Sequence, residues 1–124
     1  MRVFFSIGLK NSMFGTHSDS LSASGISWPE VEKYVNDGLV YYLDESDRPA
    51  VDALNSKYGT SIEIPKTRPD VCVEGGDTII VAEACGLPKL SKRRKYTDDE
   101  IDAVSFLFRK YMVSWRQTGQ IRVF

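Results

Sequence analysis

The chain has 124 residues, with hydrophobic side chains at 42% of positions and charged ones at 27%. This composition is typical of one globular domain over residues 1–124 and excludes disorder as the main state. The 16 Lys and Arg residues nearly balance the 17 Asp and Glu residues, so the formal net charge is −1. A protein that coats duplex DNA needs a large basic excess, so the charge excludes that class and leaves only local anion sites.

The sequence also lacks the patterns of a membrane span, a metal site or a disulfide framework. No apolar run approaches the roughly 18 residues that cross a bilayer. The two cysteines, Cys72 and Cys85, lie far from each other and from the single histidine, His17. We therefore expect no metal, no cofactor, no disulfide and no membrane partner. Both cysteines are expected to be small buried residues of adjacent strands.

Strands are indicated by β-branched and aromatic residues. These residues predict strands over 3–7, 39–43, 61–64, 70–73, 77–84 and 104–115. Gly75 and Gly76 would join two of them into a hairpin. The Ser- and Gly-rich segment 11–25 has no periodicity and predicts a loop. The last predicted strand also has partial helical spacing, but its aromatic residues favour a strand, and residues 115–124 are expected to form a tail or an edge strand.

Capping signals indicate the helices. Ser27 begins a capping box and predicts a helix over 29–37. A second helix over 49–58 would end at Gly59, and Thr97 opens a further capping box. Strands and helices together predict a single α/β (α+β) domain, with a mixed central sheet of about five strands flanked by helices.

Three short motifs follow one another in a characteristic order. The first is Leu-Lys-Asn-Ser-Met-Phe at 9–14, directly after the first predicted strand. The second is Thr-Arg at 67–68, and the third is the Gly-Asp turn at 76–77 before an apolar strand. In this order, across residues 2–114, the chain resembles the viral ring nucleases, the type III anti-CRISPR family known from archaeal viruses and phages.

The resemblance implies a homodimer that binds a cyclic oligonucleotide second messenger, typically cyclic tetra-adenylate, in the cytoplasm of the infected host cell. It places the ligand on Asn11, Ser12, Met13 and Arg68. The residue types suit this role, because Ser and Asn donate to phosphate and Arg clamps it bidentately. The alternative for Asn11 and Ser12 is an ordinary turn. For Arg68 it is a surface ion pair with Asp70 or Glu63.

Two departures from the family's motifs concern catalysis. The family's catalytic His stands where this chain has Asp47, and the family's Arg-Leu-Pro-Glu-Gly motif reads Cys-Gly-Leu-Pro-Lys at 85–89. The sequence therefore favours a sponge that sequesters the messenger over an enzyme. Two alternatives stay open: a metal-independent ring nuclease with His17 or Asp47 as its acid, and a virus interaction protein with no nucleotide ligand. An N-cap role is the other interpretation of Asp47.

A basic segment is the last candidate for ligand binding. It consists of Lys92, Arg93, Arg94 and Lys95. We expect these side chains to contact a polyanion, with Tyr96 stacking on a base. The alternative is a solvated loop that the acidic residues at 98–100 balance.

Overall fold

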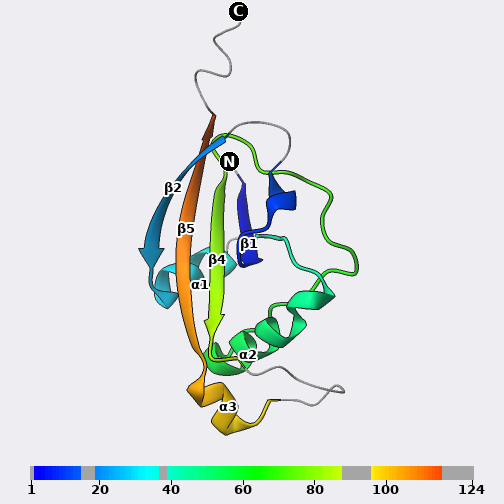
Figure 1. Ribbon diagram of the computed structural model, residues 1–124, viewed down its shortest axis with the longest axis vertical. Coiled ribbons are helices and arrows are strands. Elements are labelled where there is room, and N and C mark those ends of the chain that lie inside the picture. The colour runs from blue at the N-terminus through cyan, green and yellow to red at the C-terminus, as the bar shows by residue number, and fades with distance from the viewer. Residues whose placement is uncertain (1, 15–18, 37–38, 88–95, 116–124) are drawn as a thin grey trace, which may run out of the picture.

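A five-stranded mixed sheet organises the chain (Figure 1). The computed structural model describes residues 2–14, 19–36, 39–87 and 96–115. The strands are β1 (Val3–Ile7), β2 (Asp19–Ile26), β3 (Val40–Tyr41), β4 (Thr78–Cys85) and β5 (Ser105–Trp115). The helices are α1 (Trp28–Asn36), α2 (Arg48–Tyr58) and α3 (Asp98–Ala103), with short 3-10 turns η1 (Asn11–Met13) and η2 (Glu45–Asp47). The predicted α+β fold with a mixed sheet is confirmed.

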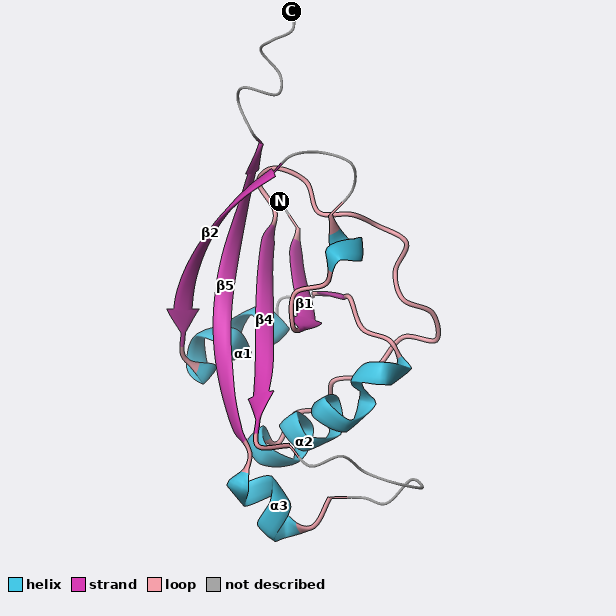
Figure 2. Cartoon of the chain, in the orientation of Figure 1, coloured by secondary structure: helices cyan, strands magenta, loops and turns pink. Residues whose placement is uncertain are grey.

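The strand order is β2-β5-β4-β1-β3 (Figure 2). β1 pairs in parallel with β3 on one side and with β4 on the other, whereas β5 runs antiparallel to β4 and to β2. The carboxyl ends of β1, β3 and β4 therefore point the same way. Because connections leave parallel strands at that edge, the segments after β1 and β3 are brought together there.

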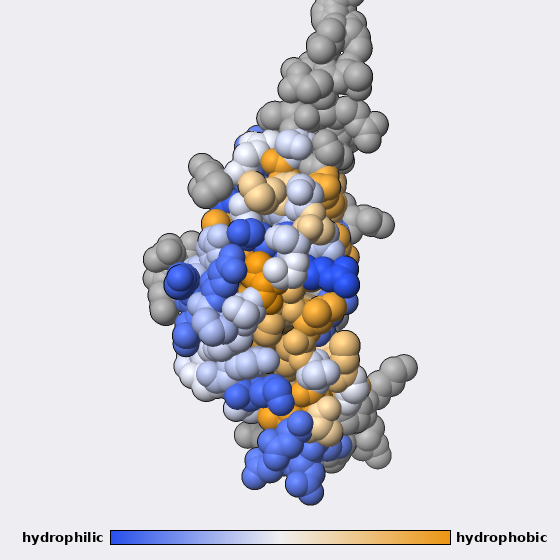
Figure 3. Space-filling model, turned by 90° about the vertical axis from the view of Figure 1, so that its left-hand side faces the viewer, coloured by the Kyte–Doolittle hydropathy of each residue, from blue (hydrophilic) through white to orange (hydrophobic). Residues whose placement is uncertain are grey.

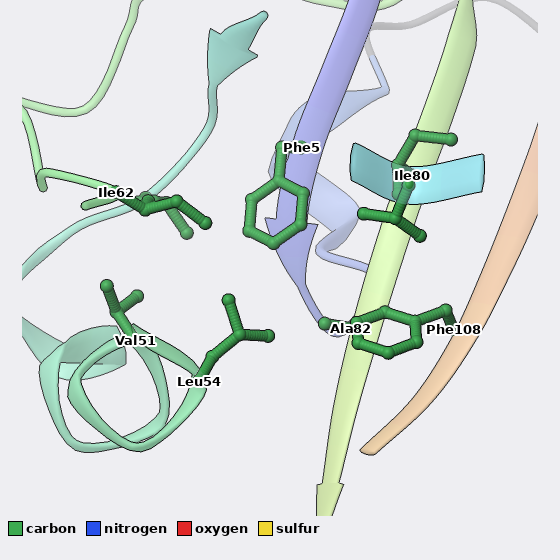
Figure 4. Packing of buried hydrophobic residues seen from close by; sticks show 9 residues of the cluster. Phe5, Val51, Leu54, Ile62, Ile80, Ala82 and Phe108 are labelled. Carbon is green, nitrogen blue, oxygen red and sulfur yellow. The ribbon is translucent and has the colours of Figure 1, made fainter. Parts of the chain in front are cut away.

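Each face of the sheet carries its own hydrophobic cluster. Successive side chains of a strand point to opposite faces, so Phe4 and Phe5 enter different clusters, and both are 0% exposed. Phe5 meets Leu54 of α2, with Ile80 and Phe108 beside it (Figure 4). On the other face, Phe4 packs with residues of the loops after β1 and before β4. Burying one such side chain contributes about 1.5–3 kcal/mol, so both faces fix the sheet.

The helices follow their capping signals. α2 has Pro in its first turn and ends at Gly59, whose φ of 68° is the left-handed conformation that glycine adopts without strain. At α3, Thr97 Oγ1 accepts from the Glu100 amide at 3.2 Å, and the Glu100 carboxylate accepts from the Thr97 amide at 2.9 Å. The capping box predicted there is confirmed. α1 also lies where the sequence predicted it, and its expected end at 37–38 lies outside the described residues.

The largest error of the sequence prediction is β2, which was expected to be part of a loop. β2 pairs with β5 over its full length. It lies at the edge of the sheet, and Leu21, Ser22 and Ala23 are all exposed. An edge strand buries little, so its sequence has no alternation of polar and apolar residues to reveal it.

Two short predicted strands are also wrong. The segment 61–64 is not a strand, because the Asn55 side chain bonds both the amide and the carbonyl of Ile62, at 3.0 and 2.9 Å. These are the groups that a strand ladder needs. The segment 70–73 forms no hairpin with β4, because β1 and β5 occupy both edges of β4. Val73 makes only an isolated bridge to Phe14.

The remaining strand predictions have mixed outcomes. The segment 104–115 is a strand, as its aromatic residues indicated, and the strand predicted over 39–43 shortens to β3. Cys72 and Cys85 are both exposed, which corrects the expectation of buried cysteines; Cys72 lies in the loop before β4. The tail beyond residue 115 lies outside the described residues.

Candidate functional site

The turn from Asp44 to Asp47 is the centre of the candidate site. It follows β3 and leads into α2. Asp44 Oδ1 accepts from the amide of Ser46 at 3.0 Å and also from its hydroxyl, and Asp47 Oδ2 accepts from the Asp44 amide at 3.0 Å. This reciprocal capping box fixes both carboxylates. The hydrogen bond from the Ser46 hydroxyl lowers the pKa of Asp44 below its ordinary value, and the Ser46 amide and the charges of Arg68 and Lys10 act in the same direction.

One carboxylate of the turn forms a buried ion pair. Lys10 Nζ lies 3.0 Å from Asp47 Oδ2, and the two side chains are 17% and 8% exposed. Nζ also lies within hydrogen-bond distance of Ser6 Oγ at 3.1 Å and of the carbonyls of Ile7 and Tyr42 at 3.3 and 3.4 Å. The ammonium therefore ties the end of β1 to the end of β3 and to the start of α2.

The same bonds define what Asp47 does. Its Oδ2 accepts from both Lys10 Nζ and the Asp44 amide. Both partners are donors, so this oxygen is an acceptor of two hydrogen bonds within the protein. Asp47 stands at the start of α2 without a side-chain bond to that helix, and its capping partner is Asp44 in the preceding turn.

The other carboxylate of the turn faces outward and holds Arg68. Arg68 Nη1 lies 3.1 Å from Asp44 Oδ2, with side-chain exposures of 37% and 34%. The guanidinium carbon lies 5.2 Å from the centre of the Tyr42 ring, in cation–π range. The ion pair expected as the alternative role of Arg68 therefore forms with Asp44, not with Asp70 or Glu63.

Tyr42 joins two of the predicted site residues. Its ring is 3% exposed and lies under Arg68, while its hydroxyl donates to Ser12 Oγ at 3.1 Å. Ser12 and Arg68 are far apart in the sequence, and each contacts the Tyr42 side chain, Ser12 at its hydroxyl and Arg68 over its ring. Both Ser12 and Arg68 are exposed.

The other predicted site residues have different positions. Met13 is 0% exposed and belongs to the cluster around Phe4, so its side chain lies beneath the site and supports η1. Asn11 begins η1. The remaining candidates, His17, Lys92, Arg93, Arg94 and Lys95, lie outside the described residues.

Sequence reasoning missed three residues that build the site. Tyr42 lies within the strand predicted over 39–43, and Lys10 lies within the motif at 9–14, but neither residue was predicted to build the site, and nor was Asp44. The available signal was the acidic run at 44–47 beside basic residues that the fold could bring near it. Across the part of the chain that the structure describes, no group of three or more His, Cys, Asp or Glu residues could hold a metal ion.

A second charged cluster lies at the other end of the strands, at the amino-terminal ends of β1 and β4. Asp77 Oδ2 accepts from Arg2 Nη2 at 2.9 Å and from the Glu74 amide at 2.8 Å, and Oδ1 accepts from the Arg2 amide at 3.1 Å. Burial raises the pKa of Asp77, but the hydrogen bonds from Arg2 and Glu74 outweigh it and hold this pKa below its ordinary value. Asp77 of the Gly-Asp motif therefore holds the start of β1 and the start of β4 together through its hydrogen bonds.

Comparison with known proteins shows the fold. No family model matches the sequence, and a search of the curated proteins found no match. Among solved structures, the chain is similar to B116 of Sulfolobus turreted icosahedral virus, with a TM-score of 0.64. The match covers 90% of this chain and 99% of that chain at 16% sequence identity. In the described ranges, no helix has the length and apolar character to span a membrane.

Proposed function

We propose that this chain is a viral anti-defence protein that binds and sequesters a cyclic oligonucleotide immune second messenger. The observation that carries the proposal is that Ser12 and Arg68, two exposed residues of the motifs, both contact the buried Tyr42 side chain. The motif order supports it by its resemblance to the viral ring nucleases. The likeness in fold to a protein of an archaeal virus supports a viral origin.

The chemistry of the two exposed side chains suits a phosphodiester. A guanidinium has five N–H donors in a fixed fork that matches two phosphate oxygens. Within the described part of the chain, Arg68 makes one hydrogen bond, from Nη1. Ser12 contacts the hydroxyl of Tyr42, and Arg68 lies over the ring of the same side chain. We infer that one phosphate can contact the remaining Arg68 donors and the Ser12 hydroxyl.

Sequestration fits the site better than cleavage. Ring opening by the route of the ring nucleases needs an acid that protonates the leaving oxygen, and such a group contributes ~10²–10⁴-fold to the rate. Asp47, in the position of the family's His, is held by Lys10 and by the Asp44 amide. A protein that binds its messenger without turnover must be present in at least the same molar amount as that messenger. We place this binding in the cytoplasm of the infected host cell.

A second copy of the chain would complete the site. A symmetric ring can meet a two-fold axis, so that every contact of one protomer is repeated by the other. β2 offers an edge strand, and Leu21, Leu107 and Met112 on β2 and β5 are exposed by 39, 43 and 56%. Figure 3 shows the left-hand side of Figure 1, where β2 lies, with hydrophobic surface beside hydrophilic surface. Light scattering should therefore give the mass of a dimer.

Retention of intact ligand tests the proposal. The purified protein is mixed with a panel of cyclic nucleotides and filtered free of unbound ligand. It is then heated, and the released nucleotide is identified by chromatography. Wild type should retain a cyclic oligonucleotide and return it intact, and Arg68→Ala should retain at least tenfold less. Arg48→Ala is the matched control, because Arg48 is exposed nearby but pairs with Glu45. Linear product would favour a ring nuclease, and no retention would favour an interaction protein without a nucleotide ligand.

A further inference from the structure

Among the residues that the structure describes, two cations of the candidate site are each paired with a carboxylate of the same short turn. Lys10 pairs with Asp47, and Arg68 pairs with Asp44. The four charges of these two pairs sum to zero. An anion that binds at Arg68 must either accept the Asp44 carboxylate as a neighbour or replace it.

The geometry around Asp44 favours replacement. Its two carboxylate oxygens have separate partners: Oδ1 accepts from Ser46, and Oδ2 accepts from Arg68. Loss of the contact to Arg68 therefore leaves the cap on η2 in place. The pair is about one-third exposed on each side, so water and salt reach it and the contact is weak.

The position of Arg68 does not depend on Asp44 alone. Its guanidinium lies over the Tyr42 ring, which is 3% exposed and held by the hydrogen bond to Ser12. A cation–π contact of this kind persists when the carboxylate leaves. The ring thus keeps the guanidinium at the site while its hydrogen-bond partner changes.

We propose that Asp44 is an internal competitor for the phosphate group at Arg68. Its carboxylate holds the guanidinium in the ligand-free protein and gives way when a phosphodiester binds. The inference rests on the proposed function and adds to it a regulation of the same site. Asp44 lowers affinity for all anions, so that only a ligand with further contacts displaces it.

The test is the affinity of Asp44→Asn for two probes, cyclic tetra-adenylate and inorganic pyrophosphate, measured by isothermal titration calorimetry at low salt. Asn keeps the capping oxygen and removes the charge. We expect Asp44→Asn to bind about two- to fivefold tighter than wild type, the range that an exposed ion pair allows. Asp44→Ser, which also caps η2, serves as a second variant of the same kind.

Two controls separate competition at Arg68 from a general loss of negative charge. Glu45→Gln removes the neighbouring charge, whose partner is Arg48, and should change affinity by less than Asp44→Asn. In an Arg68→Ala background, Asp44→Asn should have no further effect, because the contact it would release is already absent.

The outcomes distinguish this inference from the proposed function. Equal affinity of wild type and both Asp44 variants, or a gain that persists without Arg68, overturns the inference, while binding of cyclic tetra-adenylate by wild type still supports the proposed function. If Asp44→Asn gains affinity for pyrophosphate and neither protein binds any member of the cyclic nucleotide panel, the inference stands and the proposed function fails. If no protein binds either probe, both fail.

Discussion

Two ion pairs of one turn have nearly the same length and opposite roles. Lys10 and Asp47 lie 3.0 Å apart with exposures of 17% and 8%, and Arg68 and Asp44 lie 3.1 Å apart with exposures of 37% and 34%. Among the described residues, the inner ammonium has four acceptors within hydrogen-bond distance, whereas the outer guanidinium has one hydrogen bond and an aromatic ring. Distance therefore does not identify a functional pair; burial and the number of partners do.

The physical reason is the cost of leaving a charge alone. When one partner of a buried pair is removed, the other charge stays in a medium that solvates it poorly. When one partner of an exposed pair is removed, water replaces it at little cost. The inner pair is therefore part of the fold, and the low cost of separating the outer pair is what the proposed exchange of Asp44 for a ligand requires.

The largest expected effect comes from breaking the inner pair. Lys10→Met leaves Asp47 buried without its cation and should lower the free energy of unfolding by about 3–5 kcal/mol. Urea denaturation monitored by tryptophan fluorescence measures it. The double variant Lys10→Met, Asp47→Leu should recover part of the loss, because no charge then remains buried although the hydrogen bond from the Asp44 amide is lost. A loss below about 1 kcal/mol for the single variant would show that the inner pair is as dispensable as the outer one.

An intermediate effect on stability is expected from the ion pair at the amino-terminal ends of β1 and β4. Arg2 and Asp77 are 36% and 6% exposed, between the other two pairs. Asp77→Asn should cost about 1–3 kcal/mol at neutral pH, because the carboxylate accepts charge-assisted hydrogen bonds.

The pH dependence of this effect has a definite sign. The pKa of Asp77 in the folded protein lies below its ordinary value of 3.8. Its contribution to stability is therefore fully present well above pH 3.8 and is lost as the pH falls through the folded pKa. The unfolding free energies of wild type and Asp77→Asn should converge on acidification. A gap that stays constant down to pH 2 would contradict this.

The smallest effect on stability is expected at the outer pair. Arg68→Ala should change the unfolding free energy by less than about 1 kcal/mol, as exposed ion pairs do. Thermal unfolding of Arg68→Ala beside Arg48→Ala measures the difference under identical conditions. A loss as large as that of Lys10→Met would place Arg68 in the fold and not in a ligand site.

The sequence predicts well those elements whose side chains are buried on a regular pattern. β1, β4, β5 and α2 all bury apolar side chains, and their residue types indicated them. β2 was missed because most of its side chains are exposed. The segment 61–64 was misread because Asn55 supplies bonds that no local pattern reveals.

The sequence predicted residues of the candidate site, namely Ser12 and Arg68, but not the side-chain contacts that bring them together. Ser12 and Arg68 came from the motif order, but the ring that joins them looked like any aromatic strand residue. The bond between Lys10 and Asp47 links residues 37 positions apart. Such a pairing depends on β1 and β3 being neighbours, which short-range patterns do not encode.

The most direct test of the central claim is titration of cyclic tetra-adenylate into Arg68→Ala, with wild type and Arg48→Ala measured in parallel. We predict that Arg68→Ala unfolds at the same urea concentration as wild type and binds at least tenfold more weakly, while Arg48→Ala matches wild type in both. Unchanged affinity in a correctly folded Arg68→Ala protein would contradict it.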